Sequence, residues 1–398
     1  MWLKLSPREP LVIGDVRGDS QFLASKQYIP GRAVRGAWAL DLARRGHDGS
    51  AIADTVARLR IGNFFPAPDG PLDYALPVPM SALTCKRGKG FRSTNGDQEV
   101  GHGALDEFLP HLAYVLLRRA GAVFAVPFAL LCSQCGDRME RLGGFYAVCP
   151  GDRGPRYRHF RPRFHAQTKV ALSRASNAAA EGMLYTVSAL RPNTYDGQGD
   201  GLAFVGRVAG NDEAVADLMD ALARTPVGAL GSRGYGSVAP AAAEVRLPSL
   251  GQRVTAFNET LARMWDDLAR LASWPEAPRA LPEGVYFTVD LLAPGVFHED
   301  GVPSLVATIR VGGRLLQPIY WMTRPDMASG WSTAWGLPKP TALAARMGSV
   351  YAFRWEGTVD ELLPELERIE QEGVGERRDE GFGECLVCHP FHLEVEER

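Results

Sequence analysis

Apolar positions along this 398-residue chain repeat with the period of strands in some segments and with that of helices in others. Strand-like alternation marks Leu3–Gly14, Met183–Leu190, Ala203–Val208 and Val285–Leu291. Helical spacing recurs in four sets of apolar residues: Val34, Trp38 and Leu42; Ala214, Val215, Leu218, Met219 and Leu222; Leu261, Met264, Trp265, Leu268 and Leu271; and Leu362, Leu363, Leu366 and Ile369. This mixture predicts an α+β protein.

Capping residues locate the ends of these helices. Pro30-Gly31 suits a helix entrance, and Asn211 suits an N-cap. Thr358 with Glu361 forms a capping box ahead of the last helix. Pro364 lies inside that helix, where we expect it to produce a kink.

Each half of the chain ends in the same way, as a helix, a glycine-rich loop and a strand. The two loops end at Gly236 and Gly383, which lie 147 residues apart, too long a period for a solenoid. We therefore expect two copies of one domain. Three prolines, Pro275, Pro278 and Pro282, mark the linker between them. The expected parts are an N-terminal domain over 1–247, with an insertion at about 83–168 that lacks clean periodicity, a helical linker over 248–282, and a C-terminal domain over 283–398.

The charge balance excludes a free-standing protein that binds nucleic acid through bulk positive charge. The chain has 44 Lys plus Arg against 46 Asp plus Glu, for a net charge of −2. The charges are uneven, however. Seven Arg or Lys and no acidic residue lie between Arg153 and Ala180, whereas the predicted helix over 359–372 is strongly acidic. We expect that acidic face to be solvated or to dock a basic partner.

The basic stretch interleaves its cations with aromatic residues. Spaced cations can follow an RNA backbone, and aromatics between them can stack on unpaired bases. The alternative is a solvated, positively charged flap. Arg161-Pro162-Arg163 favours an extended arm over a helix. The candidate RNA contacts in this stretch are Arg161, Arg163, His165, Lys169 and Arg174.

No apolar run is long enough to span a membrane, and the N-terminus has no signal-peptide pattern. We therefore expect a cytoplasmic protein whose six cysteines are thiols or metal ligands and not disulfides. The spacing of Cys385, Cys388 and His389 matches that of c-type haem attachment. Because residues three apart on a strand point to opposite faces, we interpret these cysteines as ordinary buried thiols.

The segment Cys132-Ser-Gln-Cys135 has the shape of a zinc knuckle, and Cys149 follows it. We predict a structural zinc site of Cys85, Cys132, Cys135 and Cys149, which would fix an insertion that lacks a core of its own. His102 and His159 are the substitutes for Cys85. The alternative is four unrelated buried thiols.

The glycine-rich loops, 228–236 and 373–383, carry candidate phosphate-binding chemistry. Glycines let the backbone approach a ligand closely, and the arginines Arg233, Arg377 and Arg378 add forked cations. Tyr235 and Phe382 either stack on a base or plug the core. Neither loop is a Walker motif or a dinucleotide fingerprint.

These motifs resemble the RAMP superfamily of CRISPR-associated proteins, and the likeness extends across most of the chain. It is carried by Ile29-Pro30-Gly31 with Arg35-Gly36, by both glycine loops, by Thr168–Tyr185, by Trp335–Pro340 and by Gly348–Phe353. The combination most resembles the subtype III-D RAMP subunit of the Cas-five-like group. Arg32-Ala33 departs from the small hydroxyl residues that the family often has at this point.

The resemblance implies two ferredoxin-like (RRM-like) RAMP domains, with the zinc-binding insertion in the first. It also implies a subunit that caps the 5′ repeat-derived tag of a guide (CRISPR) RNA. Its partners would be the large polymerase/cyclase-like subunit and the backbone RAMP subunits, with target RNA contacted indirectly. The expected RNA-binding residues outside the basic stretch are Lys26, Arg32, Arg35, Arg233, Tyr235, Arg377, Arg378 and Phe382.

Catalysis is the lesser alternative. His159 and His165 are candidates for a metal-independent endoribonuclease that processes guide-RNA precursors, whereas Asp15 and Asp19 fit the family's cleavage pattern poorly. A further alternative is an assembly subunit whose glycine loops contact other proteins and not RNA. We expect no catalytic residue.

Overall fold

The computed structural model describes residues 1–14, 22–95, 98–151, 155–192, 201–276, 279–332 and 336–393. Its α-helices are α1 (Gly31–Arg44), α2 (Gly49–Val56), α3 (Phe108–Arg119), α4 (Asp212–Arg224), α5 (Leu250–Ala269) and α6 (Val359–Glu372). The predicted mixed α+β class is confirmed. None of the helices in these ranges is both long and apolar enough to cross a membrane. Asp15, Asp19, Arg153 and Trp335, singled out from the sequence, lie outside the described residues.

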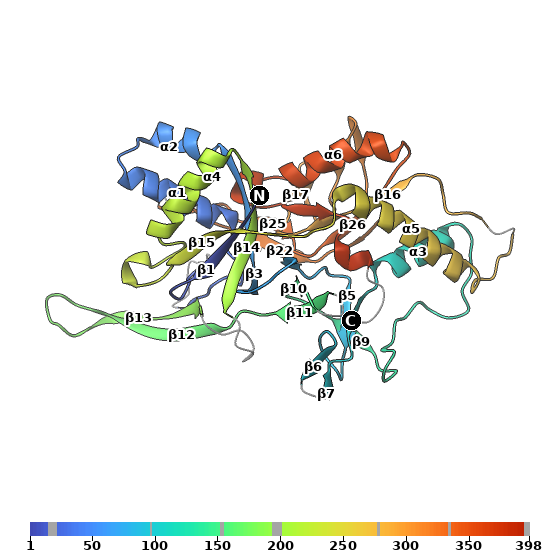
Figure 1. Cartoon of the computed structure of the whole chain (residues 1–398), viewed down its shortest axis with the longest axis horizontal. Helices are drawn as coiled ribbons and strands as arrows, with labels where there is room; N and C mark the ends of the chain where they lie inside the picture. Colours follow the sequence, from blue (N-terminus) through green and yellow to red (C-terminus); the bar gives the residue numbers. More distant parts are fainter. Residues whose placement is uncertain are drawn as a thin grey trace.

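A four-stranded antiparallel sheet organises the first half, in the order β15-β1-β14-β3. Its strands are β1 (Trp2–Pro7), β3 (Leu59–Pro68), β14 (Leu202–Gly210) and β15 (Val238–Ala243). Helices α1, α2 and α4 gather on one side of it (Figure 1). The fully buried Trp38 of α1 and Leu218 of α4 share a core with Phe204 of β14. The predicted helical faces of α1 and α4 are therefore the faces that cover the sheet.

A second four-stranded sheet has the order β21-β26-β16-β27. Its strands are β16 (Val285–Leu291), β21 (Tyr320–Met322), β26 (Val350–Trp355) and β27 (Cys385–Val387). Helix α6 lies between β26 and β27 in sequence, starts at the predicted capping box, and runs on through Pro364. Helix α5 precedes β16 and packs its Phe257 and Leu261 into the same core.

Helix α3 belongs to the segment that we expected to be an insertion in the first half, yet it packs in the core of the second. Its buried Leu109, Leu112 and Leu117 lie in one cluster with residues of α5, β16 and β26. Figure 1 shows α3 beside α5, at the far end of the molecule from α1 and α2. The chain therefore crosses to the second half and returns before the first sheet is complete.

A smaller sheet, in the order β11-β10-β4, lies against both halves. It comprises β4 (Tyr74–Pro77), β10 (Phe145–Cys149) and β11 (Arg156–Phe160). Its core includes Phe65 of the first half and Leu386 of the second. Phe64, the neighbour of Phe65 on β3, points to the other face and packs under α1. The second half of β3 is thus buried on both faces, which accounts for its apolar run from Phe64 to Pro68.

The basic stretch forms β11 and then a long hairpin of β12 (Phe164–Leu172) and β13 (Ala179–Leu190). The hairpin projects from the body (Figure 1), in agreement with the predicted extended arm, and β2 (Phe22–Leu23) pairs with its base. The remaining short strands are β5 (Ala82–Cys85), β6 (Ser93–Asn95), β7 (Gln98–Val100), β8 (Ala104–Asp106), β9 (Met139–Arg141), β17 (Phe297–Glu299), β18 (Val302–Ser304), β19 (Ile309–Val311), β20 (Arg314–Leu316), β22 (Pro325–Ala328), β23 (Trp331–Ser332), β24 (Leu337–Pro338) and β25 (Ala342–Ala345).

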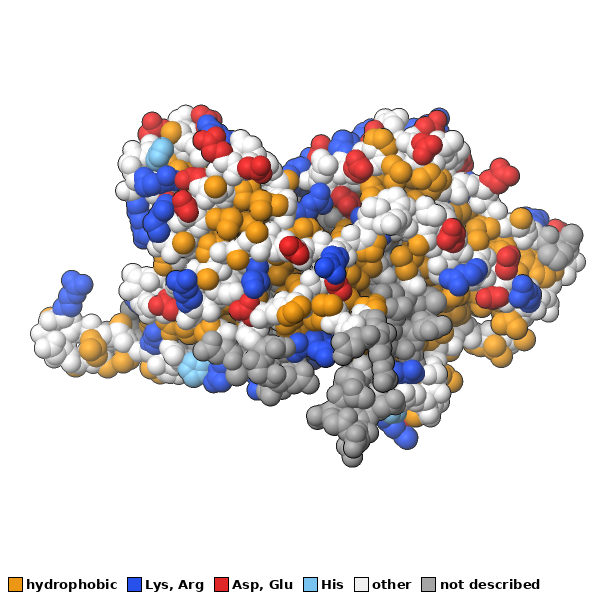
Figure 2. Space-filling view, viewed as in Figure 1, with side chains coloured by type: hydrophobic (Ala, Val, Ile, Leu, Met, Phe, Trp, Pro, Cys, Tyr) orange, Lys and Arg blue, Asp and Glu red, His pale blue; other side chains and the backbone are white. Residues whose placement is uncertain are grey.

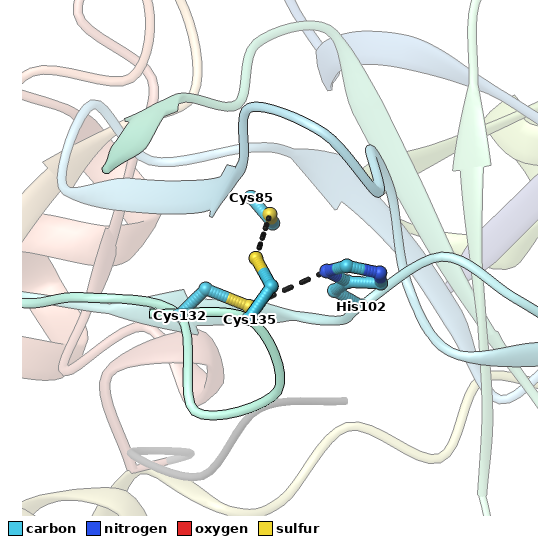
Figure 3. A group of neighbouring side chains, drawn as sticks. All are labelled: Cys85, His102, Cys132 and Cys135. Carbon is cyan, nitrogen blue, oxygen red and sulfur yellow. Dashed lines mark hydrogen bonds between the residues drawn. The ribbon is translucent and has the colours of Figure 1, made fainter. Parts of the chain in front are cut away.

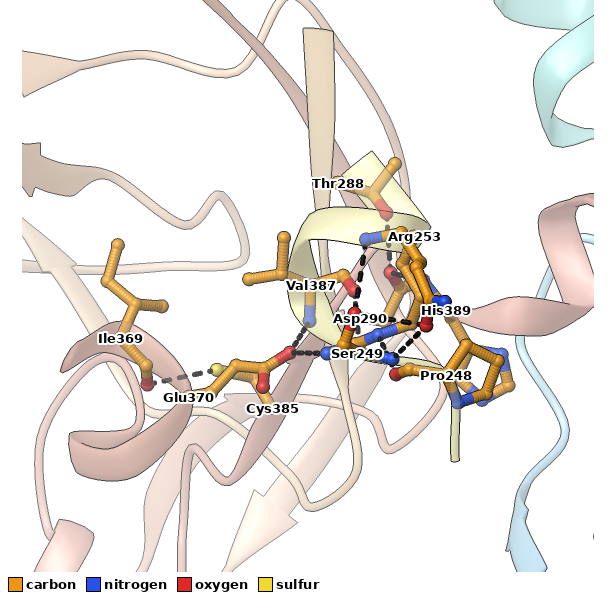
Figure 4. Close-up of polar contacts among 11 residues, drawn as sticks. Pro248, Ser249, Arg253, Thr288, Asp290, Ile369, Glu370, Cys385, Val387 and His389 are labelled. Atoms are coloured by element: carbon orange, nitrogen blue, oxygen red, sulfur yellow. Dashed lines mark hydrogen bonds and ion pairs between the residues drawn. The ribbon is translucent and has the colours of Figure 1, made fainter. Parts of the chain in front are cut away.

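Buried ion pairs connect the elements of the second half. Arg253 of α5 is 2% exposed; it lies 2.8 Å from Glu370 of α6 and donates to the carbonyl of Val387 at 2.5 Å (Figure 4). Glu370 was expected on a solvated acidic face, and that expectation is wrong for this residue, because its carboxylate turns inward to Arg253. Removing one partner of such a buried pair typically costs about 3–5 kcal/mol. Cys385 and Cys388 are buried beside this network, as expected.

A second buried network joins α3 and its preceding strand to the C-terminal segment. His392 is fully buried, with Nε2 2.6 Å from Asp290 of β16 and Nδ1 3.1 Å from Asp106 of β8. Burial by itself would lower the pKa of His392, but the two carboxylates outweigh burial and raise the pKa to about 10. A protonated imidazole therefore holds the 83–168 segment against the second sheet.

We expect the stability of the protein to fall as the pH rises from about 6.5, the pKa of an unfolded histidine. Because the pKa of His392 is raised to about 10 in the folded state, its contribution is complete below pH about 6.5 and is lost as the pH rises through about 10. Urea unfolding across this range should show a smaller pH dependence in His392→Gln than in the wild type. An equal pH dependence of the free energy of unfolding in the two proteins would contradict this role of His392.

Candidate functional site: a basic central cavity

A cavity of about 510 Å³, which we call the central cavity, lies where the two halves meet. Its lining includes residues 26–32, residues 141–145 with Arg161, residues 324–329 with Arg346, and residues 380–382. Its basic side chains are Lys26, Arg32, Arg141, Arg161, Arg324 and Arg346, against the acids Asp326 and Glu380. Figure 2 shows basic and acidic side chains interspersed over one face of the molecule, as the net charge of −2 requires. The excess of cations in the cavity is therefore a local feature.

The start of α1 delivers Arg32 to this cavity. A Cβ atom on Gly31 would lie 2.1 Å from the carbonyl oxygen of Ile61, so only glycine permits the helix to begin this close to β3. The Arg32 guanidinium donates to the carbonyl of Ser329 at 3.0 Å and lies 5.5 Å from the ring centroid of Phe382. Arg32 therefore spans from the first half to the second.

Asn63 of β3, 1% exposed, holds this junction together through its side-chain amide. Its Oδ1 accepts from the Gly31 N–H at 3.1 Å, and its Nδ2 donates to the Gly381 carbonyl at 3.2 Å and to Glu384 at 2.6 Å. Burial raises the pKa of Glu384 to about 7, despite the N–H groups of Asn63 that favour its ionised form. One amide thus fixes the start of α1 against the second glycine loop.

The two glycine loops have the same backbone conformation. In each, a residue with positive φ, Leu230 at 62° or Arg377 at 56°, precedes a short 3₁₀ helix and a second left-handed residue, Gly234 or Gly381. Each loop is closed by a 2.8 Å backbone bond, from Val227 to Gly236 or from Val374 to Gly383. The spacing of 147 residues thus holds for the positive-φ residues, the 3₁₀ helices and the closing bonds of the two loops.

This correspondence shows that the arginines of the two loops do not occupy equivalent positions. Arg233 ends its 3₁₀ helix, and Glu380 stands at the matching place in the second loop. Glu380 pairs with Arg377 at 2.8 Å. The guanidinium of Arg377 also lies 4.9 Å from the ring centroid of Phe382. Arg35 donates to the carbonyl of Asp379 at 2.6 Å. Arg377 therefore stabilises the shape of the second loop itself.

Both loop aromatics are buried: Tyr235 is 3% exposed and Phe382 8%. The Tyr235 hydroxyl donates to Gln167 at 2.5 Å, and Phe382 packs with Val296 and Ala344. Of the two roles that the sequence left open for these rings, the structure shows the packing role. A base that stacked on either ring would first have to displace it.

The predicted RNA contacts fall into two groups, those that line the central cavity and those that lie outside it. Lys26, Arg32, Arg161 and Phe382 line the central cavity. The rest lie elsewhere: Arg163, His165, Lys169 and Arg174 follow the projecting hairpin; Arg233 contacts Tyr185 of β13; and Arg378 pairs with Glu372 at 3.3 Å. Lys169 lies 4.6 Å from the ring centroid of Tyr235. The hairpin group is thus connected to the first glycine loop.

Three cavity cations were missed from the sequence: Arg141, Arg324 and Arg346. Pairing of β22 with β25 brings Arg324 and Arg346 side by side, and the Arg346 N–H donates to the Arg324 carbonyl at 2.9 Å. Both side chains are exposed, and neither forms a hydrogen bond or ion pair to another described residue. Neither lies in a recognisable motif, so only the strand pairing reveals them.

A separate cluster of candidate metal ligands lies at the end of β5 (Figure 3). The thiols of Cys85, Cys132 and Cys135 and the imidazole of His102 place their ligand atoms within 4.8 Å of one another. Burial opposes ionisation of Cys85, but backbone N–H groups of Gly88 and Arg87 and the neighbouring thiols outweigh it and lower its pKa to about 7. The cluster can therefore hold a metal ion, with three of the four predicted cysteines among its ligands.

Cys149 is not part of this cluster, so the predicted four-cysteine set is wrong at this position. Cys149 ends β10 and is buried in the apolar core beneath that sheet. His102, which was considered only as a substitute for Cys85, stands in the place predicted for Cys149, and Cys85 keeps its own place. The other substitute, His159, lies elsewhere, with Nε2 2.6 Å from the Gly143 carbonyl oxygen.

Comparison with known proteins gives one family. Residues 162–390, more than half of the chain, match the family model described as CRISPR-associated protein (Cas_Cmr3). No curated protein matches the sequence.

Solved structures give only weak likenesses. A chain of the cryo-EM structure of the Type III-B Cmr-beta bound to cognate target RNA and AMPPnP has a TM-score of 0.44 and 11% identity, covering 99% of this chain and 94% of that one. A chain of the crystal structure of the Csm3-Csm4 subcomplex in the type III-A CRISPR-Cas interference complex has a TM-score of 0.34 and 10% identity, covering 89% and 94%. Similarities of this size carry no argument about function.

Bound metal should depend on the cluster of Figure 3 and not on Cys149. Elemental analysis of purified protein should find about one metal ion per chain, as expected for a site with three thiolates and one imidazole. We expect Cys132→Ser to lose most of this metal and Cys149→Ser to retain it. Equal loss in both variants would contradict the ligand set.

Truncating Asn63 should loosen the junction between the halves. Asn63→Ala leaves Gly31 and Glu384 without their side-chain partners, and we expect it to lower the free energy of unfolding by about 2–4 kcal/mol. Asn63→Asp keeps an acceptor for Gly31 but removes both amide donors and adds a carboxylate beside Glu384. Urea denaturation measures both variants, and an effect of Asn63→Ala below about 0.5 kcal/mol, as for ordinary surface positions, would contradict this role.

Proposed function

Because the chain belongs to the Cas_Cmr3 family of CRISPR-associated proteins, we propose that it is an RNA-binding structural subunit of a type III CRISPR effector ribonucleoprotein in antiviral defence. In this proposal it caps the 5′ repeat-derived tag of the guide RNA. The observation that carries the proposal is the central cavity, with six basic and two acidic side chains in its lining.

The cavity suits an unpaired RNA strand for electrostatic reasons. Phosphates gain most from cations whose charge no protein acid neutralises, and Arg324 and Arg346 have no such partner among the described residues. The apolar side chains of Tyr28, Met327 and Met347 lie in the same lining and offer contact to a base. The projecting hairpin, with Arg163, His165, Lys169 and Arg174, extends the basic surface beyond the cavity.

We propose two ferredoxin-like domains, 1–247 and 283–398, joined by 248–282. Two observations support this division: both sheets connect their strands in the order fourth-first-third-second, and the glycine loops match residue by residue. In the second domain, α5 takes the place of the missing first helix. We retain subtype III-D, from the sequence motifs, as part of the proposal.

The proposed partners are the guide RNA, the large polymerase/cyclase-like subunit and the backbone RAMP subunits, with target RNA contacted indirectly. The setting is the cytoplasm. A single subunit with a net charge of −2 would bind RNA weakly by bulk electrostatics, so a cavity completed by neighbouring subunits fits this chemistry.

We propose that the metal of the Cys85, His102, Cys132 and Cys135 cluster is zinc in a structural role. Three thiolates and one imidazole form a usual closed zinc site. The observed 3.5 Å from Cys85 Sγ to Cys135 Sγ, and from Cys132 Sγ to His102 Nδ1, suits a tetrahedral arrangement. The metal would fix the loops that follow β5 and α3.

We propose that the subunit is not catalytic. His159 lies against the Gly143 carbonyl, and His165 against the Arg191 guanidinium at 3.3 Å, so each imidazole already has a neighbour on the protein. Endoribonuclease activity on guide-RNA precursors, with either histidine as the base, is the alternative that the following experiment separates.

The test mixes purified protein with a repeat-derived RNA carrying the 5′ tag, in chelator, and follows both RNA retention and RNA length. We expect intact RNA to be retained, with Arg346→Glu weakening binding by at least about tenfold through loss and reversal of one phosphate contact. Arg44→Glu, at the exposed far end of α1, makes the same charge change outside the cavity and should leave binding nearly unchanged.

Other outcomes assign other functions. RNA shortened in wild type but not in His159→Ala or His165→Ala would make the protein a processing enzyme. Equal weakening by Arg346→Glu and Arg44→Glu would place RNA outside the cavity. If RNA binds neither the free subunit nor the whole complex through this chain, while the complex still assembles, the subunit serves assembly without RNA contact.

A further inference from the structure

A second concave surface lies in the other half of the molecule, and it shares no lining residue with the central cavity. This groove has a volume of about 620 Å³ and lies between the end of α3, the β19–β20 hairpin and the end of β26. Its basic side chains are Arg119, Arg279, Arg314 and Arg354. We call it the arginine groove.

The arginine groove has a net positive charge. Its one acidic lining residue is Glu356, which pairs with Arg354 at 2.7 Å. Arg119 donates to the Ile319 carbonyl at 2.9 Å, and Arg314 lies 5.7 Å from the centroid of the Trp355 ring. Neither Arg119 nor Arg314 forms an ion pair with another residue in the described part of the chain. Two guanidinium groups therefore face the groove without a counter-charge from the protein.

The floor between these arginines is aliphatic. Leu116, Pro282, Leu316 and Ile319 line it, and Leu315 at the rim is 55% exposed. An aliphatic floor combined with unneutralised arginines has the composition of a protein–protein interface, in which the core is apolar and arginine is enriched.

The lining favours a protein segment over single-stranded nucleic acid. Sequence-tolerant binding of single strands depends on open aromatic faces, on which bases stack. Tyr286, one of the two aromatic residues in the lining, is only 2% exposed, and the guanidinium of Arg314 lies over the ring of the other, Trp355. Aliphatic side chains instead match leucine- or valine-like side chains of a peptide.

We propose that the arginine groove binds an acidic segment of a partner protein, with Asp or Glu side chains on Arg119 and Arg314 and aliphatic side chains on the floor between them. The groove is separate from the central cavity, so the proposal does not rest on RNA binding there. It gives the subunit two surfaces of different chemistry, one for phosphates and one for an acidic, apolar protein segment.

The test places a photoreactive p-benzoylphenylalanine at Leu315, in the complex purified through a tag on this chain, and identifies the crosslinked product by mass spectrometry. We expect a protein segment with several Asp or Glu residues. Arg119→Glu combined with Arg314→Glu should lower the crosslink yield by about tenfold, because charge pairs at an interface become repulsive. Arg44→Glu, far away on α1, should leave the yield unchanged.

We expect the double variant to fold, because both side chains are exposed. Thermal melting of the variant tests this. A crosslink to RNA, a crosslinked segment without acidic residues, no crosslink to protein, or a yield that does not respond to the charge reversals would overturn the proposal. Retention of tagged RNA, measured in parallel with Arg346→Glu, reports on the central cavity alone. Failure of one surface is thereby distinguished from failure of the other.

Discussion

The arrangement of the central cavity depends on one buried amide. Asn63 binds the first N–H of α1, the carbonyl of Gly381 and the carboxyl of Glu384, which belong to segments more than 300 residues apart in sequence. A side chain with both a donor and an acceptor group is needed here, because the helix start offers N–H and the glycine loop offers C=O. This junction fixes the start of α1, which carries Arg32, against the loop that carries Phe382, and so defines one wall of the cavity.

The two halves are interlocked beyond this junction. Helix α3 leaves the first half, packs on α5 in the second, and is held there by the charged clamp of His392 between Asp106 and Asp290. The small sheet of β4, β10 and β11 then fills the space under both large sheets. Because these contacts are buried, the relative placement of the halves is fixed by packing and not by a flexible linker. A rigid placement suits a cavity whose walls come from both halves.

Net charge gives little information about the binding surfaces of this protein. The chain is slightly acidic overall, yet one concave surface collects six cations around two acids, and another collects four arginines around one. One acid in each lining is engaged in a local pair, Glu380 with Arg377 and Glu356 with Arg354. Positive charge that no acid among the described residues pairs with is therefore concentrated in concave surfaces, which focus the electric field on a ligand.

The sequence by itself determined the local features of this protein. The period of its apolar residues predicts the α4 and α6 faces and the bounds of β16, the caps at Asn211 and Thr358 are confirmed, and the glycine loops match across 147 residues. Two members of the candidate metal cluster, Cys132 and Cys135, also follow from cysteine spacing. These features depend on neighbours close in sequence, or on a repeat that two loops share.

Only the tertiary structure decided which distant residues meet. It replaced Cys149 with His102, turned Glu370 inward to Arg253, buried Tyr235 and Phe382, and brought Arg324 and Arg346 into the cavity. It also placed α3 in the second core. Each of these outcomes depends on long-range strand pairing and on packing between layers, for which no local periodicity carries a signal.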